Sequence, residues 1–225
     1  RQWLVTSRRF RTFAEQYHTK IRAKLRGAGD AEALHDLLFE LEIAHWLLQE
    51  KRFHLAYEPQ TIRTGPRPDF TVTLTTKWQF HVEVTRIHTT MTAESSQEEP
   101  VLDSYQRKLL MVILGKLSQI KAGASNLLLI GLAPDLLMER TVDELIKQMK
   151  QRIEKNDLAL LPRSRLQTSA AFFKQYYALS GIFFYFLPKP VEPTFAPPFL
   201  WLNKEAKYPL VTQVQTILHQ LATNE

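Results

Sequence analysis

Two carboxylates in the middle of the chain are spaced so that they can face each other across a hairpin. The segments Asp69–Leu74 and Trp78–Ile87 alternate apolar and polar residues, as half-buried strands do. If a three-residue turn centred on Thr76 joins them, Asp69 lies opposite Glu83 on the polar face. Like charges in such a pair repel each other, whereas a divalent cation between them reverses the sign. Hard oxygen ligands suit Mg²⁺ or Mn²⁺, so this pair predicts a metal site.

A third acid favours the metal interpretation over a hairpin face that is simply solvated, where water would screen the two charges. Glu40 falls in a predicted helix over residues 31–51 and shares one face of it with Leu37, Ala44 and Leu47. An acid on an apolar stripe is disfavoured unless it has a partner. We therefore expect Glu40 to join the hairpin acids; the alternative is an acid at the edge of the stripe that points outward.

A lysine lies in a similar position on the next predicted helix, over residues 103–121. Lys116 falls in the middle of an apolar stripe made of Tyr105, Leu109, Val112, Ile113 and Ile120. Lysine is rarely buried without a partner, but its stem can follow apolar surface and present the ammonium at the end. The three acids are a suitable destination, and Gln119 could join them. The alternative is a helix end that leaves the core, with Lys116 in water.

The surrounding elements predict an α/β (α+β) fold with a mixed central sheet flanked by helices, because helical and strand patterns alternate along the chain. We divide the chain into a basic N-terminal helix within residues 1–30, a core over 31–132, and helices and strands over 133–225 that complete the same domain. Asp30 is placed to cap the helix that follows it. Further strands are predicted at 53–57, 126–132, 181–187 and 199–202, and further helices at 7–26, 141–153, 170–178 and 210–222.

Together these residues resemble the PD-(D/E)xK nuclease superfamily, whose core runs helix, strand, hairpin, helix, strand. The helix of that core gives a glutamate, the first hairpin strand Pro-Asp and the second Glu-x-Lys. The resemblance covers roughly 31–132 and rests on Phe39-Glu40-Leu41, Pro68-Asp69-Phe70 and Val82-Glu83-Val84-Thr85. The stretch Asn203 to Leu210 is also similar to an Asn-x-x-Ala-x-x-Pro-Leu segment of prokaryotic members, and we assign it a structural role.

The chain departs from the family at Thr85, which stands where the lysine is expected. In some members that lysine has moved to the following helix, and Lys116 with Gln119 resembles this arrangement. Lys108 lies off the apolar stripe, and Arg86 points to the face opposite Glu83, so neither is expected to replace it.

The resemblance implies a restriction-endonuclease-like fold and metal-dependent hydrolysis of phosphodiester bonds in DNA, in prokaryotic defence or repair. Asp69 and Glu83 would hold one or two Mg²⁺ or Mn²⁺ ions, with the carbonyl of Val84 as a further ligand. Glu40 would bind a water on the metal or a second ion, and Lys116 would orient the attacking water or stabilise developing charge. A core that binds nucleic acid without cutting it, and a structural protein with solvated acids, are the alternatives.

The composition of the chain favours some classes of function and excludes others. The formal net charge of +6 favours a polyanion such as nucleic acid, and the N-terminal arginines and lysines could grip its backbone or form a solvated basic face. The chain has no cysteine, which excludes disulfides, thiolate metal sites and cysteine nucleophiles and fits a cytoplasmic location. No apolar run is long enough for a membrane span. No glycine-rich phosphate loop, zinc-spaced histidine pair or serine elbow is present, and a homodimer is compatible with the sequence.

Overall fold

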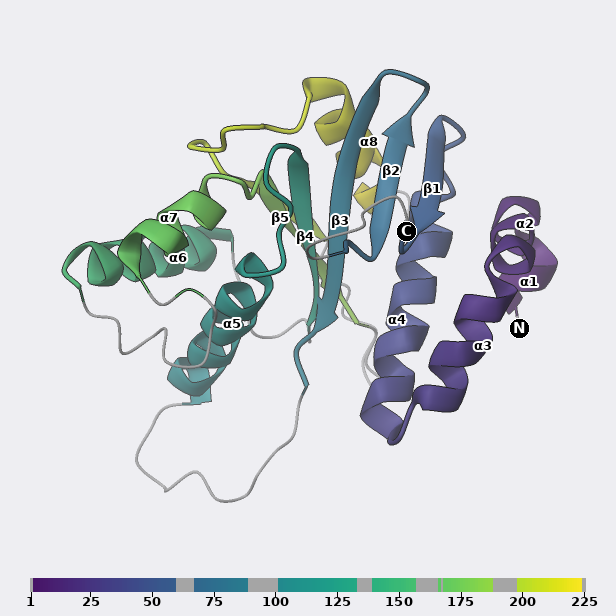
Figure 1. Ribbon diagram of the computed structural model, residues 1–225, viewed down its shortest axis with the longest axis horizontal. Coiled ribbons are helices and arrows are strands. Elements are labelled where there is room, and N and C mark those ends of the chain that lie inside the picture. Colours follow the sequence, from purple (N-terminus) through teal and green to yellow (C-terminus); the bar gives the residue numbers. More distant parts are fainter. Residues whose placement is uncertain are drawn as a thin grey trace.

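A six-stranded mixed sheet forms the centre of the molecule (Figure 1). The computed structural model describes residues 2–59, 67–88, 101–132, 139–156, 166, 168–187 and 198–223. The strands lie in the sheet in their order along the chain. The central pairs β3–β4 and β4–β5 are parallel, and the outer pairs are antiparallel. The strands are β1 (Phe53–Tyr57), β2 (Phe70–Leu74), β3 (Trp78–Arg86), β4 (Ser125–Leu132), β5 (Gly181–Phe186) and β6 (Phe199–Leu202).

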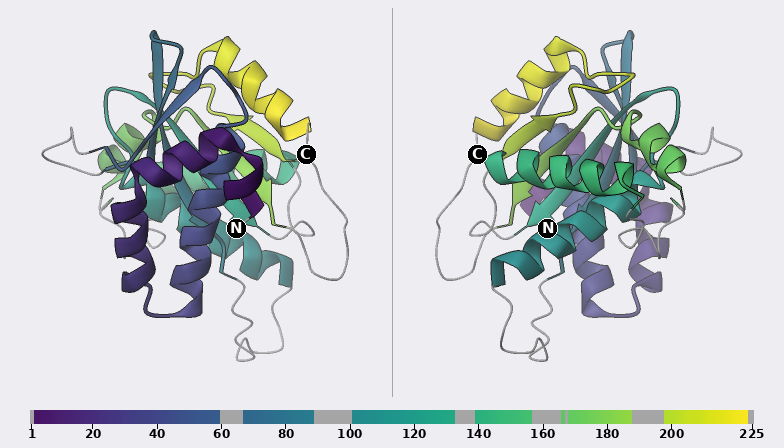
Figure 2. Two further views of the ribbon diagram at one scale, coloured as in Figure 1. Left: turned by 90° about the vertical axis from the view of Figure 1, so that its right-hand side faces the viewer. Right: turned by 90° about the vertical axis from the view of Figure 1, so that its left-hand side faces the viewer.

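Helices cover both faces of the sheet (Figures 1 and 2). Helices α4 (Ala31–Leu47) and α8 (Thr212–Thr223) pack on one face, and α5 (Val101–Leu117), α6 (Glu139–Glu154) and α7 (Ser169–Tyr176) on the other. The prediction of an α+β fold with a mixed sheet is therefore confirmed. The order α4, β1, β2–β3 hairpin, α5, β4 follows the sequence of elements expected over residues 31–132.

The β2–β3 hairpin has the predicted register. Leu74 pairs with Trp78 and Phe70 pairs with Val82, so a three-residue turn joins the strands. Alternation of apolar and polar residues fixes this register, because a slip of one residue would turn every buried side chain to the opposite face. The apolar set lies in the core beneath α4; its members are Phe70, Val72, Leu74, Phe80, Val82 and Val84. The residues between them on β3 face α5.

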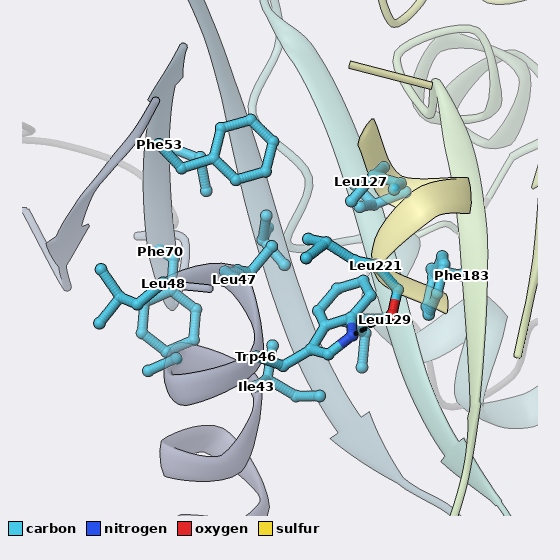
Figure 3. Close-up of a cluster of buried hydrophobic side chains, with 14 of the residues drawn as sticks. Ile43, Trp46, Leu47, Leu48, Phe53, Phe70, Leu127, Leu129, Phe183 and Leu221 are labelled. Atoms are coloured by element: carbon cyan, nitrogen blue, oxygen red, sulfur yellow. Dashed lines mark hydrogen bonds between the residues drawn. The ribbon is translucent and has the colours of Figure 1, made fainter. Parts of the chain in front are cut away.

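The core on the α4 side is rich in aromatic side chains (Figure 3). Trp46 of α4 packs against Phe183 of β5, with ring centroids 4.8 Å apart. Its indole nitrogen donates to the carbonyl of Leu221 at 3.4 Å, so the polar atom of this buried ring has a partner in α8. These contacts hold α4 against the sheet. Asp30 caps the helix as predicted, accepting a hydrogen bond from the amide of Ala33 at 2.7 Å.

The prediction of one basic helix over residues 7–26 is wrong. The chain forms α1 (Gln2–Thr6), α2 (Arg8–Gln16) and α3 (His18–Gly27), with a break at Tyr17, whose backbone is not helical (φ −105°, ψ 16°). The break allows α2 to bury Phe10 and Phe13 in the core while α3 contacts α4. The helix predicted over 103–121 also ends early, at Leu117, where the chain closes a turn in which the Gln119 amide donates to the Lys116 carbonyl.

Two of the N-terminal cations stabilise the fold. Arg9 donates to the carbonyls of Leu48, Glu50 and Phe53, just beyond the end of α4. Lys20 donates to the carbonyls of Tyr57 (2.8 Å) and Glu58 (2.6 Å). The last carbonyls of a helix lack intrahelical partners, so the Arg9 guanidinium is favourable at the end of α4, whereas Lys20 binds carbonyls at the end of β1. These two side chains therefore bind the backbone of the fold, a role that the sequence did not predict.

Replacing Gly131 with Ala should lower the free energy of unfolding by about 1–3 kcal/mol, because the new methyl group overpacks the core. A Cβ atom at Gly131 would lie 2.6 Å from the ring of Phe39, which is only 2% exposed. Denaturant titration measures the loss. Gly115→Ala is the matched control, since its Cβ meets nothing within 4 Å. In a Phe39→Leu background the penalty at Gly131 should shrink; an unchanged penalty would refute this explanation.

Candidate active site

Glu83 is a buried acid in the middle of the sheet. It lies on β3 opposite Leu128 of β4, and only 5% of its surface is exposed. The ammonium of Lys116 approaches its Oε2 at 3.4 Å. Its Oε1 is buried and has no hydrogen-bond partner among the residues that the structure describes. A buried polar atom of this kind lowers the stability of the folded state unless another group binds it, because burial removes it from water.

Asp69 lies beside Glu83, at the start of the hairpin. It precedes β2, so the register that pairs Phe70 with Val82 places it opposite Glu83. Its Oδ2 accepts a hydrogen bond from the amide of Val84 at 2.8 Å. This bond crosses the hairpin and holds the carboxylate against β3. Asp69 and Glu83 are thus brought together, as the sequence predicted, whereas the contact with Val84 is made by its amide and not by the carbonyl that was expected as a ligand.

Burial and neighbouring carboxylates raise the pKa of both hairpin acids. Burial, and next the charge of Asp69, raises the pKa of Glu83 to about 8, although Lys116 opposes the shift. Burial, and next the charge of Glu40, raises the pKa of Asp69 to about 6. A buried and a half-buried carboxylate that face each other cannot both ionise easily. The pair therefore binds a proton more readily than isolated carboxylates do, and a bound cation would oppose this.

Lys116 reaches the acids from α5. Its side chain is 21% exposed, and its ammonium also lies 3.3 Å from the Oε1 of Gln119. The prediction that Lys116 lies near Glu83 is confirmed, and the alternative of a lysine in bulk water is wrong. Arg86, as expected, is on the other face, where it pairs with Glu32 (2.7 Å) and Asp36 (3.0 Å) of α4.

Glu40 has partners that the sequence did not reveal. Its Oε2 accepts hydrogen bonds from the Tyr57 hydroxyl and the Lys24 ammonium, both at 2.7 Å. Lys24 also pairs with Glu58 at 2.7 Å. Glu40 is nevertheless close enough for its charge to raise the pKa of both Asp69 and Glu83. The helix acid therefore belongs to the same electrostatic cluster as the hairpin acids.

The arrangement of the acids suits a cation that is held by two carboxylates. It does not suit a cation that needs three protein ligands. In the part of the chain that the structure describes, no three histidine, cysteine, aspartate or glutamate residues gather closely enough to ligate one ion. Mg²⁺ is usually held by one or two carboxylates and keeps several waters. Glu83 Oε1, to which no described residue bonds, matches this requirement together with the half-buried Asp69.

Replacing Glu83 with Gln should make the cation-free protein more stable in alkaline solution. Because burial raises the folded pKa of Glu83 from 4.5 to about 8, the folded state keeps a proton that the unfolded chain releases between these values. The contribution of Glu83 to the free energy of unfolding is therefore fully present below its unfolded pKa of 4.5. It is lost as the pH rises through the folded pKa of about 8. The neutral amide escapes the loss, so Glu83→Gln should gain about 2–4 kcal/mol over wild type at high pH.

Denaturant unfolding in a chelator at about pH 5 and about pH 9 measures this difference. The gain should appear at the higher pH and nearly vanish at the lower one. A gain of equal size at both would mean that ionisation of Glu83 is not its cause.

Comparison with known proteins does not assign this site. The chain matches no protein-family model, no curated protein and no solved structure. Among the described helices, none combines the length and apolar character needed to cross a membrane. The function must therefore be argued from the residues themselves.

Proposed function

We propose that the chain is a Mg²⁺-dependent nuclease of the PD-(D/E)xK type that hydrolyses phosphodiester bonds of DNA. The observation that carries the proposal is the buried Glu83 opposite the half-buried Asp69: among the described residues no group bonds to Glu83 Oε1, and the ammonium of Lys116 lies beside Oε2. A purely structural role would leave this arrangement with an uncompensated cost. A divalent cation compensates it, and Mn²⁺ could take the place of Mg²⁺.

Each residue has a definite role in this proposal. Asp69 and Glu83 hold the cation, with the carbonyl of Val84 as a further ligand. The bound ion would lower the pKa of a water and neutralise charge on the phosphate. Lys116 donates hydrogen bonds to the attacking water or to the phosphoryl oxygens, where negative charge develops. Gln119 accepts a hydrogen bond from Lys116 and orients it.

The arrangement of elements supports the choice of superfamily. The chain runs α4, β1, hairpin, α5, β4, and the acids lie on α4, before β2 and on β3. Thr85 stands where the superfamily has a lysine, and in this proposal Lys116 of α5, which contacts Glu83, takes the place of that lysine. This migration is what the resemblance implied for a variant without Glu-x-Lys.

The net charge of +6 supports a polyanionic substrate, and we propose DNA, with a role in prokaryotic defence or repair in the cytoplasm. An inactive nucleic-acid-binding module is the second candidate. It is favoured by Thr85 and by the ion pair that engages Lys116 with Glu83, which could leave no ammonium for the phosphate.

A cleavage assay separates these functions. Plasmid and single-stranded DNA are incubated with the protein in Mg²⁺, in Mn²⁺ and in excess chelator, and binding is followed in parallel by mobility shift. A nuclease should cut only with the divalent cation and regain activity when it is restored. Binding without cleavage in every condition would support the inactive module. The absence of both, with no Mn²⁺ uptake in calorimetry, would refute the proposed function.

A further inference from the structure

The ammonium of Lys24 lies between two carboxylates next to the proposed metal site. It contacts Glu40 and Glu58, each at 2.7 Å, and the three side chains are 16–32% exposed. The Tyr57 hydroxyl donates to the same oxygen of Glu40, and the ring of Tyr57 lies 5.0 Å from the ammonium. Lys24 is thus held in place by two charges and an aromatic face. This is the environment that a bound cation occupies.

The backbone beneath this cluster is built to hold it. Glu58 has a left-handed backbone (φ 40°), which is uncommon for a residue other than Gly, Asn or Asp. Its amide donates to the carbonyl of Asp69 at 2.9 Å, and its carbonyl accepts from Lys20, one turn before Lys24 on α3. A strained residue persists only when its surroundings determine it. Helix α3 therefore clamps the turn that adjoins Asp69.

We propose that Lys24 takes the place of a second divalent cation and leaves the protein with a one-ion site at Asp69 and Glu83. This inference rests on the proposed metal site and decides between the two roles open to Glu40. The Lys24 ammonium and the Tyr57 hydroxyl engage Glu40 Oε2, so a second ion would have to displace a paired ammonium. Glu40 then acts on the bound ion only through water. Lys24 is a positioning residue, because its ammonium holds the carboxylates of Glu40 and Glu58 in place.

Mn²⁺ titration of the full chain tests this inference without reference to catalysis. Calorimetry and the Mn²⁺ electron paramagnetic resonance signal both give the number of bound ions. Wild type should bind one ion. The Lys24→Met variant frees the carboxylates of Glu40 and Glu58, so this variant should bind two Mn²⁺ ions. Lys24→Arg keeps the charge and should bind one.

Lys20→Met is the matched control. It removes a lysine that clamps the same turn through backbone carbonyls, so it should still bind one ion. The double variant Lys24→Met with Glu40→Gln should return to one, because the released pair of acids is then incomplete. Circular dichroism verifies that each variant is folded.

The outcomes separate this inference from the proposed function. Two ions in wild type would overturn the inference directly, and this measurement does not depend on any variant. One ion in both wild type and Lys24→Met would overturn it while leaving the metal site intact. No ion in either protein would overturn the metal site and this inference with it.

Discussion

Replacing Asp69 with Asn should reduce cleavage of DNA by about 10³-fold or more, while binding of DNA is unchanged or stronger. The amide keeps the size of the carboxylate and can still accept the hydrogen bond from the Val84 amide. It cannot supply the negative charge that a divalent cation requires. Loss of one charge also relieves the repulsion with Glu83, so the folded protein should not be destabilised.

Single-turnover cleavage of a labelled duplex in Mg²⁺ measures the effect, and a filter-binding assay in chelator measures affinity. Glu42→Gln is the matched control: Glu42 is a partly buried acid of α4 that accepts a hydrogen bond from Tyr185 at 3.1 Å, away from the hairpin. Its cleavage rate should equal that of wild type. An active Asp69→Asn protein would exclude Asp69 as a ligand of the catalytic ion.

Replacing Lys116 with Met should reduce the cleavage rate by about 10²–10³-fold, as the loss of one well-placed donor does in other enzymes. Methionine fills the volume of the lysine stem, so the packing of α5 is kept. The ammonium that contacts Glu83 is lost, and Mn²⁺ should bind as tightly as in wild type or more tightly, since it no longer competes with a positive charge.

Two variants make this prediction specific. Lys121→Met removes a lysine from the loop after α5 and should alter only the salt dependence of DNA binding. Thr85→Lys in the Lys116→Met background puts a lysine at the usual superfamily position, two residues after Glu83 on the same face of β3, and should restore part of the rate. Normal cleavage by Lys116→Met would show that the catalytic cation comes from elsewhere.

The hairpin and its acids could be predicted because their signals are local. Alternation of apolar and polar residues over two strands fixes both the register and the face, and Asp69 then lies opposite Glu83 without any knowledge of the rest of the fold. Lys116 could be predicted because a lysine on a buried stripe needs a partner. These inferences depend on patterns that persist in almost any packing of the strands and helices.

The surroundings of Glu40 could not be predicted in the same way. Lys24 is one of many N-terminal cations, and nothing in the sequence around it distinguishes it. The sequence also gives no sign that the helix breaks at Tyr17. Only the packing of α3 against α4 brings Lys24 to Glu40, and only the left-handed turn at Glu58 brings in the second acid. Both features arise from long-range contacts, which periodicity does not encode.

The central claim is that Asp69 and Glu83 bind one divalent cation between them. Crystals soaked in Mn²⁺ and measured near the manganese absorption edge test it most directly, because anomalous density identifies the ion by position. We expect a single anomalous peak from an ion that oxygens of both carboxylates coordinate, with the Lys116 ammonium beside it. We expect no peak between Glu40 and Glu58. Saturating Mn²⁺ with no peak between Asp69 and Glu83 would contradict the claim.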